Sequence, residues 1–389
     1  MKKCKVLFLL GDIWSMGKNK GMPSIFKLLE KADKEFNVTI FTTDKEDYSK
    51  ELPNSKIFYF KKVTFTSKKN RYLKYIYNRW NNFILNIKYL YFYFKINEKY
   101  DVVYCSSSVP IFATYIIKLF SRVKTIHRIY GTFLYGKTDS FFEKLKKFEE
   151  VLSFKLPADK YIITDDGTFG DKVAEYFNVP KEKIIFLKNG VDKINTDIEE
   201  IKKKFNLNNA DFKCLAVSRL VSWKRVDRII KAFNNIENNK IKLYIVGDGD
   251  ELPKLKKLAK NKNIFFLGAL SSKEVQGLME CTDCFISMYD VSNVSNPLLE
   301  AMAHSMPIIT YDSGNTKSII NGKNGILITK QNEEEIVNEL REVILHLYNN
   351  SEYLKDLSQN AKVFFENNLY TWDRRIDMEI NIIREMCEK

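Results

Sequence analysis

Long apolar runs are missing from this sequence of 389 residues. No stretch of 18 or more apolar residues occurs, so no segment is expected to span a membrane. The apolar run at 6–10 is too short for the hydrophobic region of a signal peptide and indicates a buried first strand. These features predict a cytoplasmic protein whose apolar residues form ordinary globular cores.

Motifs for common cofactors and metals are also absent. The sequence has neither the GxGxxG dinucleotide fingerprint nor a phosphate-binding P-loop. Cys281 and Cys284 form a CxxC pair, but no second pair or histidine set follows at zinc spacing, which favours two packed thiols. Cys4, Cys105 and Cys214 lie in strand-like apolar runs, where cysteine behaves as a small hydrophobic residue. We therefore expect no metal site.

Acidic residues are scarce in one segment of this basic chain, whose net charge is +14. Between Lys61 and Lys99 there are ten Lys or Arg residues, many aromatic residues and a single acid, Glu98. The segment could contact an anionic membrane surface, or it could be a solvated helix whose aromatic side chains pack inward. No nucleic-acid-binding signature accompanies it, so nucleic acid is not an expected partner.

Short β-rich runs alternate with helical stretches along the chain, as is typical of parallel sheets with crossover helices. We predict an α/β protein of two doubly wound, Rossmann-like domains, 1–187 and 188–370. Ligands of such sheets bind beyond the carboxyl ends of the strands, so two facing domains would share a central cleft. Strands are expected at 4–10, 38–42, 101–105, 123–127, 160–164 and 184–187, then at 213–217, 241–246, 264–267, 283–287, 307–310 and 326–328.

Two strand-to-helix loops of the second half could bind an anion. Arg219 follows a strand and Lys224 precedes a helix, so the two cations could hold a diphosphate and stabilise it as it leaves. A chance surface pair is the alternative in a chain with 63 Lys and Arg residues. In the other loop, Asn296 is suited to cap a helix whose free N–H groups attract anions. Glu300, one turn further, could accept hydrogen bonds from ribose hydroxyls or only favour the helix dipole.

Three further positions lie at expected strand ends. The loop after the first strand contains Gly17 and Gly21, which could approach a phosphate or a sugar. Gly247 begins another strand-end turn, either a ligand contact or a plain tight turn. His127, one of only three histidines, ends a predicted strand where the cleft is expected. A lone histidine is more often structural than catalytic.

Taken in order, these loops resemble the retaining GT-B glycosyltransferases of glycosyltransferase family 4. The similarity is strongest over 189–328, and several spaced motifs agree. The motifs are Asn189–Asp192, Ser218–Leu220 with Lys224, Gly247–Gly249, Leu267–Gly268, and Glu300–Ala303 followed by Pro307–Ile309.

The resemblance implies roles for these residues. Arg219 and Lys224 would hold the donor diphosphate, Glu300 the nucleotide ribose, and His127 would lie beside the donor sugar. Gly17 and Gly21 would lie near the phosphates or the acceptor. Such enzymes are generally metal-independent and retain the anomeric configuration by same-face attack. Their final helix commonly crosses back onto the first domain, which would place 371–389 there.

The sequence departs from the family pattern at one position. The first glutamate of the family's Glu-x7-Glu segment would fall on Ser292. The donor sugar would then be held by Asn293, by His127 or by backbone N–H groups between Ser292 and Leu298.

We therefore expect a glycosyltransferase without a cofactor, which moves a sugar from a nucleoside diphosphate sugar, a UDP-sugar by frequency, to a glycan or lipid-linked acceptor in bacterial-type surface polysaccharide synthesis. It would act in the cytoplasm or peripherally at the inner face of the membrane through 61–99. A nucleotide-sugar epimerase and a non-catalytic binding protein on the same fold are the alternatives. The epimerase needs cleft carboxylates that move protons, and no such set can be placed here.

Overall fold

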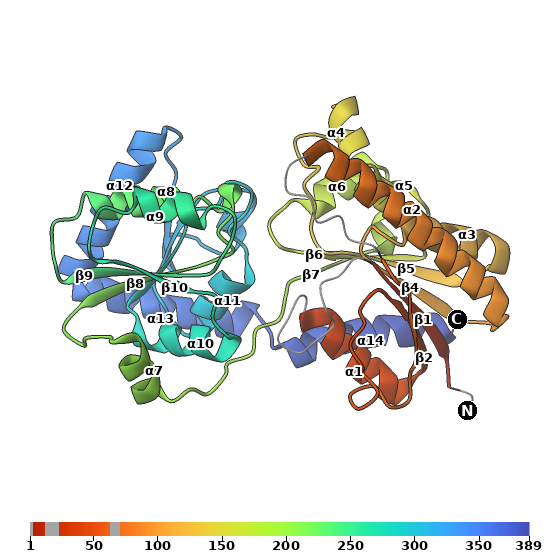
Figure 1. The fold of residues 1–389 in the computed structure, drawn as a ribbon. Coiled ribbons are helices and arrows are strands. Elements are labelled where there is room, and N and C mark those ends of the chain that lie inside the picture. The colour runs from red at the N-terminus through yellow and green to blue at the C-terminus, as the bar shows by residue number, and fades with distance from the viewer. Residues whose placement is uncertain (1–2, 12–22, 63–70, 389) are drawn as a thin grey trace. The chain divides into compact units, whose positions relative to one another are not determined.

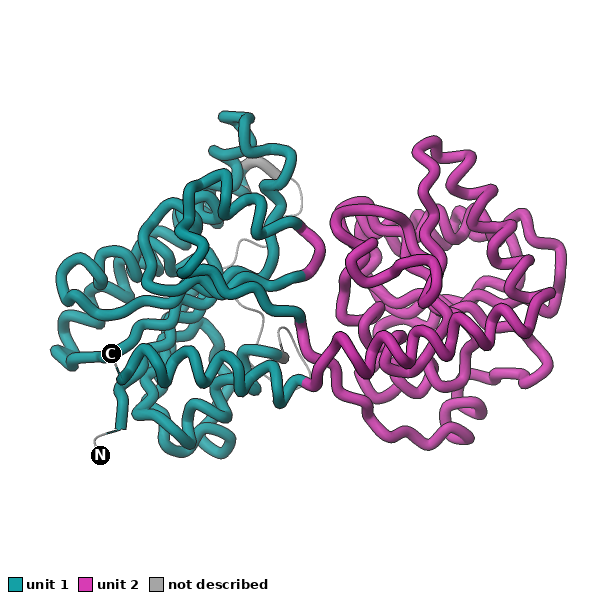
Figure 2. Tube along the Cα trace, turned by 180° about the vertical axis from the view of Figure 1, so that it is seen from behind, with its two compact units in different colours: residues 1–165, 169–188, 372–389 teal, residues 166–168, 189–371 magenta. Residues whose placement is uncertain are grey.

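The computed structural model describes residues 3–11, 23–62 and 71–388. The chain divides into two compact units, which Figure 2 distinguishes by colour. The first unit comprises residues 1–165, 169–188 and 372–389, and the second comprises 166–168 and 189–371. The sequence predicted a domain boundary between residues 187 and 188. The chain leaves the first unit and enters the second one residue later, between 188 and 189.

The first unit is built on a parallel sheet, and its seven described strands take the order β3-β2-β1-β4-β5-β6-β7. Its central strands consist mostly of fully buried apolar residues, as expected for a sheet covered on both faces. The strands are β1 (Lys5–Leu10), β2 (Asn37–Thr42), β3 (Lys56–Tyr59), β4 (Val102–Ser106), β5 (Lys124–Ile129), β6 (Lys160–Thr164) and β7 (Ile184–Leu187).

Helices cover both faces of this sheet, as Figure 1 shows. α1 and α14 share one apolar core with the sheet, and α2 and α3 share another on the opposite face. Among the described helices, none combines the length and apolarity that a membrane-spanning segment requires. The helices are α1 (Pro23–Glu35), α2 (Arg71–Ile96), α3 (Ile111–Ser121), α4 (Phe141–Lys146), α5 (Phe148–Lys155), α6 (Gly170–Tyr176), the 3-10 helix η1 (Lys181–Lys183) and α14 (Trp372–Glu388).

The last helix, α14, is held in the first unit by apolar and charged contacts. Its buried Trp372, Ile376, Ile380 and Ile383 recur at helical spacing and pack in the core beside α1. Glu379 on the same helix pairs with two buried arginines, Arg128 of β5 at 3.0 Å and Arg375 at 2.5 Å. It also accepts a hydrogen bond from the Tyr104 hydroxyl at 2.8 Å. Because a buried charge is strongly destabilising when unpaired, this network fixes how α14 lies on the sheet.

Cysteine usage differs in one respect from the sequence-based interpretation. Cys4, expected to act as a small hydrophobic residue, forms a disulfide with Cys387 at the end of α14, and their Cα atoms lie 5.9 Å apart. The pair is 383 residues apart in sequence, so local composition could not indicate it. Cys281 and Cys284 are buried free thiols, as expected. The disulfide therefore joins the two ends of the described chain within the first unit.

The second unit repeats the architecture with a smaller sheet, and its six described strands take the order β10-β9-β8-β11-β12-β13, all parallel. The strands are β8 (Phe212–Val217), β9 (Ile241–Val246), β10 (Ile264–Gly268), β11 (Cys284–Ser287), β12 (Ile308–Tyr311) and β13 (Ile326–Ile328).

Helices again cover both faces, with α8, α9 and α12 on one and α7, α10, α11 and α13 on the other. Capping side chains define several helix starts, such as the reciprocal Ser271–Glu274 capping box of α10. The helices are α7 (Ile198–Phe205), α8 (Val226–Asn234), α9 (Leu252–Leu258), α10 (Ser272–Cys281), α11 (Asn296–Ala303), α12 (Glu333–Asn349), α13 (Ser351–Asn368), and the 3-10 helices η2 (Ser222–Lys224) and η3 (Thr316–Ser318).

Two strands differ from the sequence-based expectation by more than one residue at an end. β3 was not predicted, because it is a short edge strand of four residues that is only partly buried. β5 continues two residues beyond its predicted end at His127, to Ile129. Strand β5 therefore has His127 and Arg128 in its interior rather than at the start of a loop.

Candidate functional site

Arg219 follows β8 at the carboxyl edge of the second unit's sheet, on a loop held by backbone hydrogen bonds. The N–H of Ser218 donates to the carbonyl of Val246 at 3.1 Å, and the N–H of Leu220 donates to that of Asp248 at 2.9 Å. Arg219 between them is exposed. The loop is thus attached to the turn after the neighbouring strand β9, while the arginine side chain reaches solvent.

Two glycines in that turn make the close approach possible. A Cβ atom on Gly247 would lie 1.8 Å from the carbonyl oxygen of Ser218, and one on Gly249 would lie 2.4 Å from that of Leu220. Gly247 also has φ +133°, a backbone conformation that disfavours other residues. The structure therefore gives Gly247, which the sequence suggested as a donor contact, a definite role in positioning the Arg219 loop.

Lys224 ends the short helix η2, beside Arg219. Its ammonium lies 3.5 Å from the centre of the Tyr289 ring and 4.1 Å from that of Trp223. Burial, together with the neighbouring Arg219 guanidinium, lowers the pKa of Lys224 to about 7. Tyr289 is itself held by a hydrogen bond from its hydroxyl to the Val217 carbonyl at 3.0 Å. Each of these two cations destabilises the charged form of the other. An anion bound to both would therefore stabilise both charges.

Asn293, expected to contact the donor sugar, instead organises the loop that follows β11. The side chain is fully buried. Its Nδ2 donates to the Tyr311 carbonyl at 2.8 Å and to Ser313 Oγ at 2.9 Å, and its Oδ1 accepts from the Tyr289 N–H at 3.1 Å. These bonds join the loops after β11 and β12. Because the polar atoms are used inside the protein, we replace the sugar-contact role with a positioning role.

Ser292, at the position of the missing glutamate, is also buried and engaged. Its hydroxyl donates to the Asp166 carbonyl at 2.6 Å, within the segment 166–168 that belongs to the second unit, and accepts from the Val294 N–H at 3.1 Å. Gly314 packs closely here, since a Cβ atom on it would lie 2.5 Å from the Val291 carbonyl oxygen. Ser292 therefore shapes the loop, and its hydroxyl does not reproduce the missing carboxylate.

Helix α11 begins one residue from the expected point. Ser295, not Asn296, occupies the cap position, and it makes no side-chain hydrogen bond to the first turn. Asn296 instead accepts a hydrogen bond from Asn189 Nδ2 at 2.8 Å. Leu298 is fully buried, so only its backbone could serve a ligand. An uncapped helix start at the carboxyl edge of a parallel sheet is suited to an anionic group.

Glu300 lies within α11, largely withdrawn from water. Burial raises the pKa of this carboxyl group to about 7. No compensating cation contributes to the shift, so the group is poised to gain from hydrogen-bond donors such as hydroxyls. The strands that precede the Arg219 and Glu300 loops, β8 and β11, are neighbours in the sheet. The sheet therefore brings the predicted diphosphate and ribose residues to one edge.

Sequence reasoning missed a charged network that supports this edge. Arg228, buried in α8, pairs with Asp290 at 2.9 Å and with Glu333 at 2.6 Å. Arg225 pairs with the same two acids and with Asp227. Hydrogen bonds from Arg228 and Arg225 lower the pKa of Glu333 to about 2. The spacing of Arg225 and Arg228 was visible in the sequence, but their distant partners were not.

His127 does not occupy the position that sequence analysis assigned to it. Its side chain is 1% exposed, its Nδ1 lies 3.2 Å from the Ser153 carbonyl, and its ring packs edge-on against Tyr161. Burial lowers its pKa to about 4, so the ring is neutral at physiological pH. This is the environment of a core histidine rather than of a group open to a sugar. Gly17 and Gly21 lie outside the described residues.

Comparisons with known proteins agree with this architecture. Residues 197–364 match the family model described as Glycosyl transferases group 1. An uncharacterized glycosyltransferase of Methanocaldococcus jannaschii is 29% identical over 309 residues, 75% of this chain and 77% of that protein. The alpha-monoglucosyldiacylglycerol synthase of Acholeplasma laidlawii is 30% identical over 173 residues, 43% of this chain and 42% of that protein.

Solved structures show the same fold at low sequence identity. Anabaena HepE, in complex with UDP and glucose, has a TM-score of 0.73 and 16% identity, with 98% of this chain and 99% of that chain covered. WaaG, a glycosyltransferase involved in lipopolysaccharide biosynthesis, has a TM-score of 0.69 and 16% identity, with 96% and 99% covered.

The predicted fold class is confirmed, because two parallel-sheet α/β domains with these structural neighbours define the GT-B fold. Its matched family domain and its named relatives identify the chain further as a glycosyltransferase.

Proposed function

We propose that this glycosyltransferase takes its sugar from a nucleoside diphosphate sugar, in particular a UDP-sugar, and retains the anomeric configuration. The observation that carries the proposal is the pair of cations at the end of β8, where burial and Arg219 lower the pKa of Lys224. A diphosphate would relieve that unfavourable arrangement. The UDP bound by the structurally similar HepE supports the choice of nucleotide.

The proposed reaction exchanges one bond for another at the sugar's anomeric carbon. The bond to the donor's β-phosphate oxygen breaks, and the acceptor hydroxyl oxygen bonds to the same face of the sugar. The hydroxyl proton passes to the leaving phosphate, so no external base is needed. Negative charge grows on the diphosphate during this step, and Arg219 and Lys224 would stabilise it without a divalent metal ion.

The acceptor is proposed to be a glycan or a lipid-linked molecule, used in surface polysaccharide synthesis by a protein that is cytoplasmic or peripherally attached to an anionic membrane. Helix α2, which forms most of the described part of the basic segment, contains five Lys or Arg residues and no acid. The relative of this chain from Acholeplasma laidlawii is named alpha-monoglucosyldiacylglycerol synthase, which supports a lipid environment. The basic surface of α2 would attract anionic lipid headgroups.

The first experiment measures which nucleotide sugar raises the unfolding temperature of the protein, because a ligand of the native state stabilises it. Calorimetric titration of that donor and of its bare nucleoside diphosphate then tests Glu300. A hydrogen bond to a charged group contributes about 1.5–3 kcal/mol, so Glu300→Gln should weaken both ligands about ten- to a hundredfold.

Both ligands carry the ribose, so equal weakening is the expected pattern. Glu352→Gln, an exposed change on α13, is the matched control and should leave both affinities unchanged. If Glu300→Gln weakens only the intact donor, Glu300 contacts the sugar and the proposed placement of the nucleotide is wrong. If no nucleotide sugar stabilises the protein, the donor assignment fails.

A further inference from the structure

Two adjoining pockets lie in the first unit, between α2, the start of α3 and the α4–α5 segment. The larger, about 810 Å³, is lined by charged and hydroxyl-bearing residues, including Ser108, Glu149 and Glu150. The smaller, about 400 Å³, is lined mainly by apolar residues. They share Tyr75, Arg79 and Glu149, so one continuous space changes from polar to apolar along its length.

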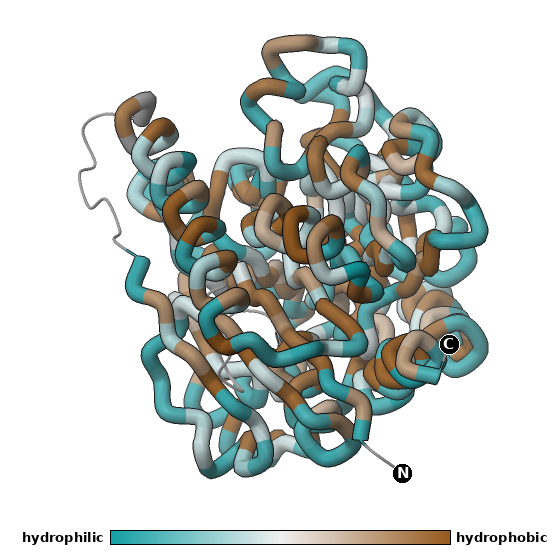
Figure 3. The backbone as a smooth tube through the Cα atoms, turned by 90° about the vertical axis from the view of Figure 1, so that its right-hand side faces the viewer, coloured by the Kyte–Doolittle hydropathy of each residue, from teal (hydrophilic) through white to brown (hydrophobic). Residues whose placement is uncertain are grey.

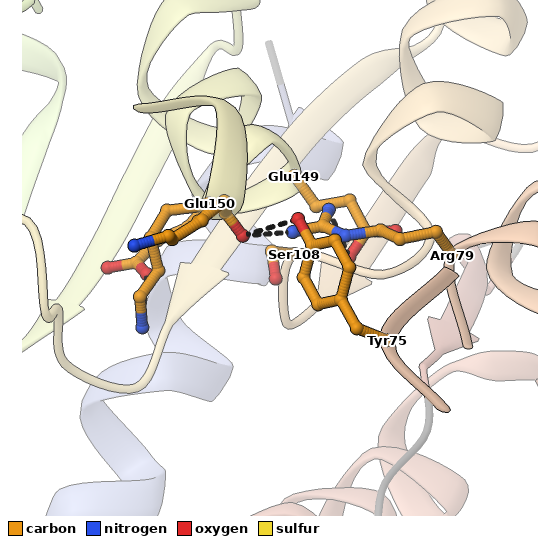
Figure 4. Close-up of a pocket in the computed structure, with 7 residues that line it drawn as sticks. Tyr75, Arg79, Ser108, Glu149 and Glu150 are labelled. Carbon is orange, nitrogen blue, oxygen red and sulfur yellow. Dashed lines mark hydrogen bonds and ion pairs between the residues drawn. The ribbon is translucent and has the colours of Figure 1, made fainter. Parts of the chain in front are cut away.

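The polar pocket contains charges of both signs held in place. Figure 4 shows Tyr75 and Arg79 extending from α2 toward the segment with Glu149 and Glu150. Arg79 pairs with Glu149 at 3.2 Å, and the Tyr75 hydroxyl donates to the Lys146 carbonyl at 3.1 Å. Glu150 accepts from the Phe133 N–H at 2.8 Å. Two carboxylates and three cations, Arg79, Lys146 and Lys147, therefore line this pocket, and the carboxylates can accept hydrogen bonds from the hydroxyls of a sugar or polyol.

The apolar pocket is walled by aromatic and aliphatic side chains that remain partly open to water. Leu145 is 57% exposed and Phe148 is 49% exposed, and both face the same space as Ile111 and Leu152. Its volume lies in the range of small-molecule sites. Binding of a hydrocarbon chain to this exposed apolar surface is favourable, because it removes apolar surface from water.

The two pockets lie near the edge of the first unit's sheet at which a substrate for sugar transfer is expected to bind. Ser108 lies just after β4, at the carboxyl edge of the first unit's sheet, where parallel sheets bind their ligands. The apolar pocket extends from there beneath α2, whose charged residues are all basic. Figure 3 colours the backbone by hydropathy, and brown hydrophobic stretches alternate with teal hydrophilic ones along the helices.

We propose that these pockets bind the acceptor as one amphiphile, with a hydroxyl-bearing headgroup in the polar pocket and one hydrocarbon chain in the apolar pocket. This inference rests on the proposed transfer from a nucleotide sugar and names the acceptor as a lipid with a sugar or polyol head. A lipid at an anionic membrane surface could enter with its chain first, guided by the basic residues of α2.

The first test is calorimetric titration of n-hexyl, n-octyl and n-decyl glucoside, each below its micelle concentration. Burying one methylene contributes about 0.8 kcal/mol, so affinity should rise about threefold to fourfold for each added methylene. Leu145→Gln and Phe148→Gln should lower octyl glucoside affinity at least about tenfold. Affinity that is independent of chain length in the wild type would overturn the proposal.

The matched control is Phe142→Gln. Phe142 and Leu145 both lie on α4. Phe142 is 73% exposed, but it does not line the pocket. It should leave octyl glucoside affinity unchanged, and equal weakening by Phe142→Gln and Leu145→Gln would indicate general surface adhesion instead. All three positions are exposed, so unchanged unfolding temperatures should confirm that each variant folds.

The headgroup is tested with octyl phosphate, which has the same chain. Glu150→Gln should weaken octyl glucoside about tenfold, because a charged acceptor for a headgroup hydroxyl is lost, and it should not weaken octyl phosphate. Tighter binding of octyl phosphate to the wild type would overturn the hydroxyl-bearing headgroup.

Donor binding separates this inference from the proposed function. Leu145→Gln should keep the thermal stabilisation by UDP while losing sugar transfer to octyl glucoside, followed by mass spectrometry. Absence of any UDP or nucleotide-sugar effect in the wild type counts against the proposed donor, whereas the glucoside titrations still decide the pocket. A normal donor effect with no alkyl glucoside binding counts against the pocket alone.

Discussion

The two units share a parallel-sheet architecture but hold their candidate sites in different ways. In the second unit, the loops at the sheet edge are joined by buried hydrogen bonds and ion pairs, such as those of Asn293 and Arg228. In the first unit, the candidate site is a space between helices with partly exposed aromatic walls. A charged ligand requires groups fixed in advance, whereas a hydrocarbon chain requires only shape and apolar surface.

The largest effect is expected from the cations of the second unit. Arg219→Ala and Lys224→Ala should each lower turnover about ten- to a thousandfold, the scale of losing one preorganised charge donor. Single-turnover kinetics with the true donor would measure this. The exposed Lys355→Ala on α13 should leave the rate unchanged. Near-wild-type rates in both site variants would remove the clamp from the mechanism.

Asn293→Ala tests whether the second unit's site depends on its buried polar bonds. Truncation leaves the Tyr311 carbonyl and the Tyr289 N–H without this partner, and each buried unsatisfied group is destabilising by about 1–3 kcal/mol. We expect the free energy of unfolding in urea to fall by about 3 kcal/mol. Asn296→Ala, which removes one bond to Asn189, should lower it by about 1 kcal/mol. Equal losses would contradict the positioning role of Asn293.

A pH titration distinguishes Lys224 from a permanently charged group. The pKa of Lys224 is about 7 in the free protein, and a bound diphosphate would raise it. Above pH 7 the free lysine loses its proton and binding must restore it, so nucleoside diphosphate affinity should fall by up to about tenfold per pH unit. Calorimetry between pH 7 and pH 9 measures the slope. Lys224→Arg should abolish it, and a persisting slope would point to another group.

The smallest effects belong to the basic surface of the first unit. Exposed Lys88 and Lys95 lie on α2, and each positive charge near an anionic membrane contributes about 1 kcal/mol. Lys88→Gln and Lys95→Gln should each weaken binding to anionic vesicles about fivefold, and added salt should weaken it further. Lys355→Gln is the control. Equal recovery on neutral and anionic vesicles at low salt would favour the merely solvated helix face.

The comparison also shows what could be predicted from sequence. Strands were predicted well because buried parallel strands form continuous apolar runs, and Arg219 and Lys224 follow directly from the end of one such run. His127 was misplaced because β5 continues two residues past it, through the charged Arg128. That charge stays inside β5 because Glu379, far along the chain on α14, neutralises it. Networks between distant residues, including those of Asn293 and Arg228, leave no local pattern.

The return of α14 to the first unit has a consequence for synthesis on the ribosome. The core beneath β1 is completed by Trp372, Ile376, Ile380 and Ile383, which are translated after the whole second unit. At typical elongation rates, the 183 residues between Lys188 and Trp372 require about 10–40 s. During that interval the nascent first unit presents an open apolar groove, so it is the part of the chain on which a ribosome-associated chaperone would act.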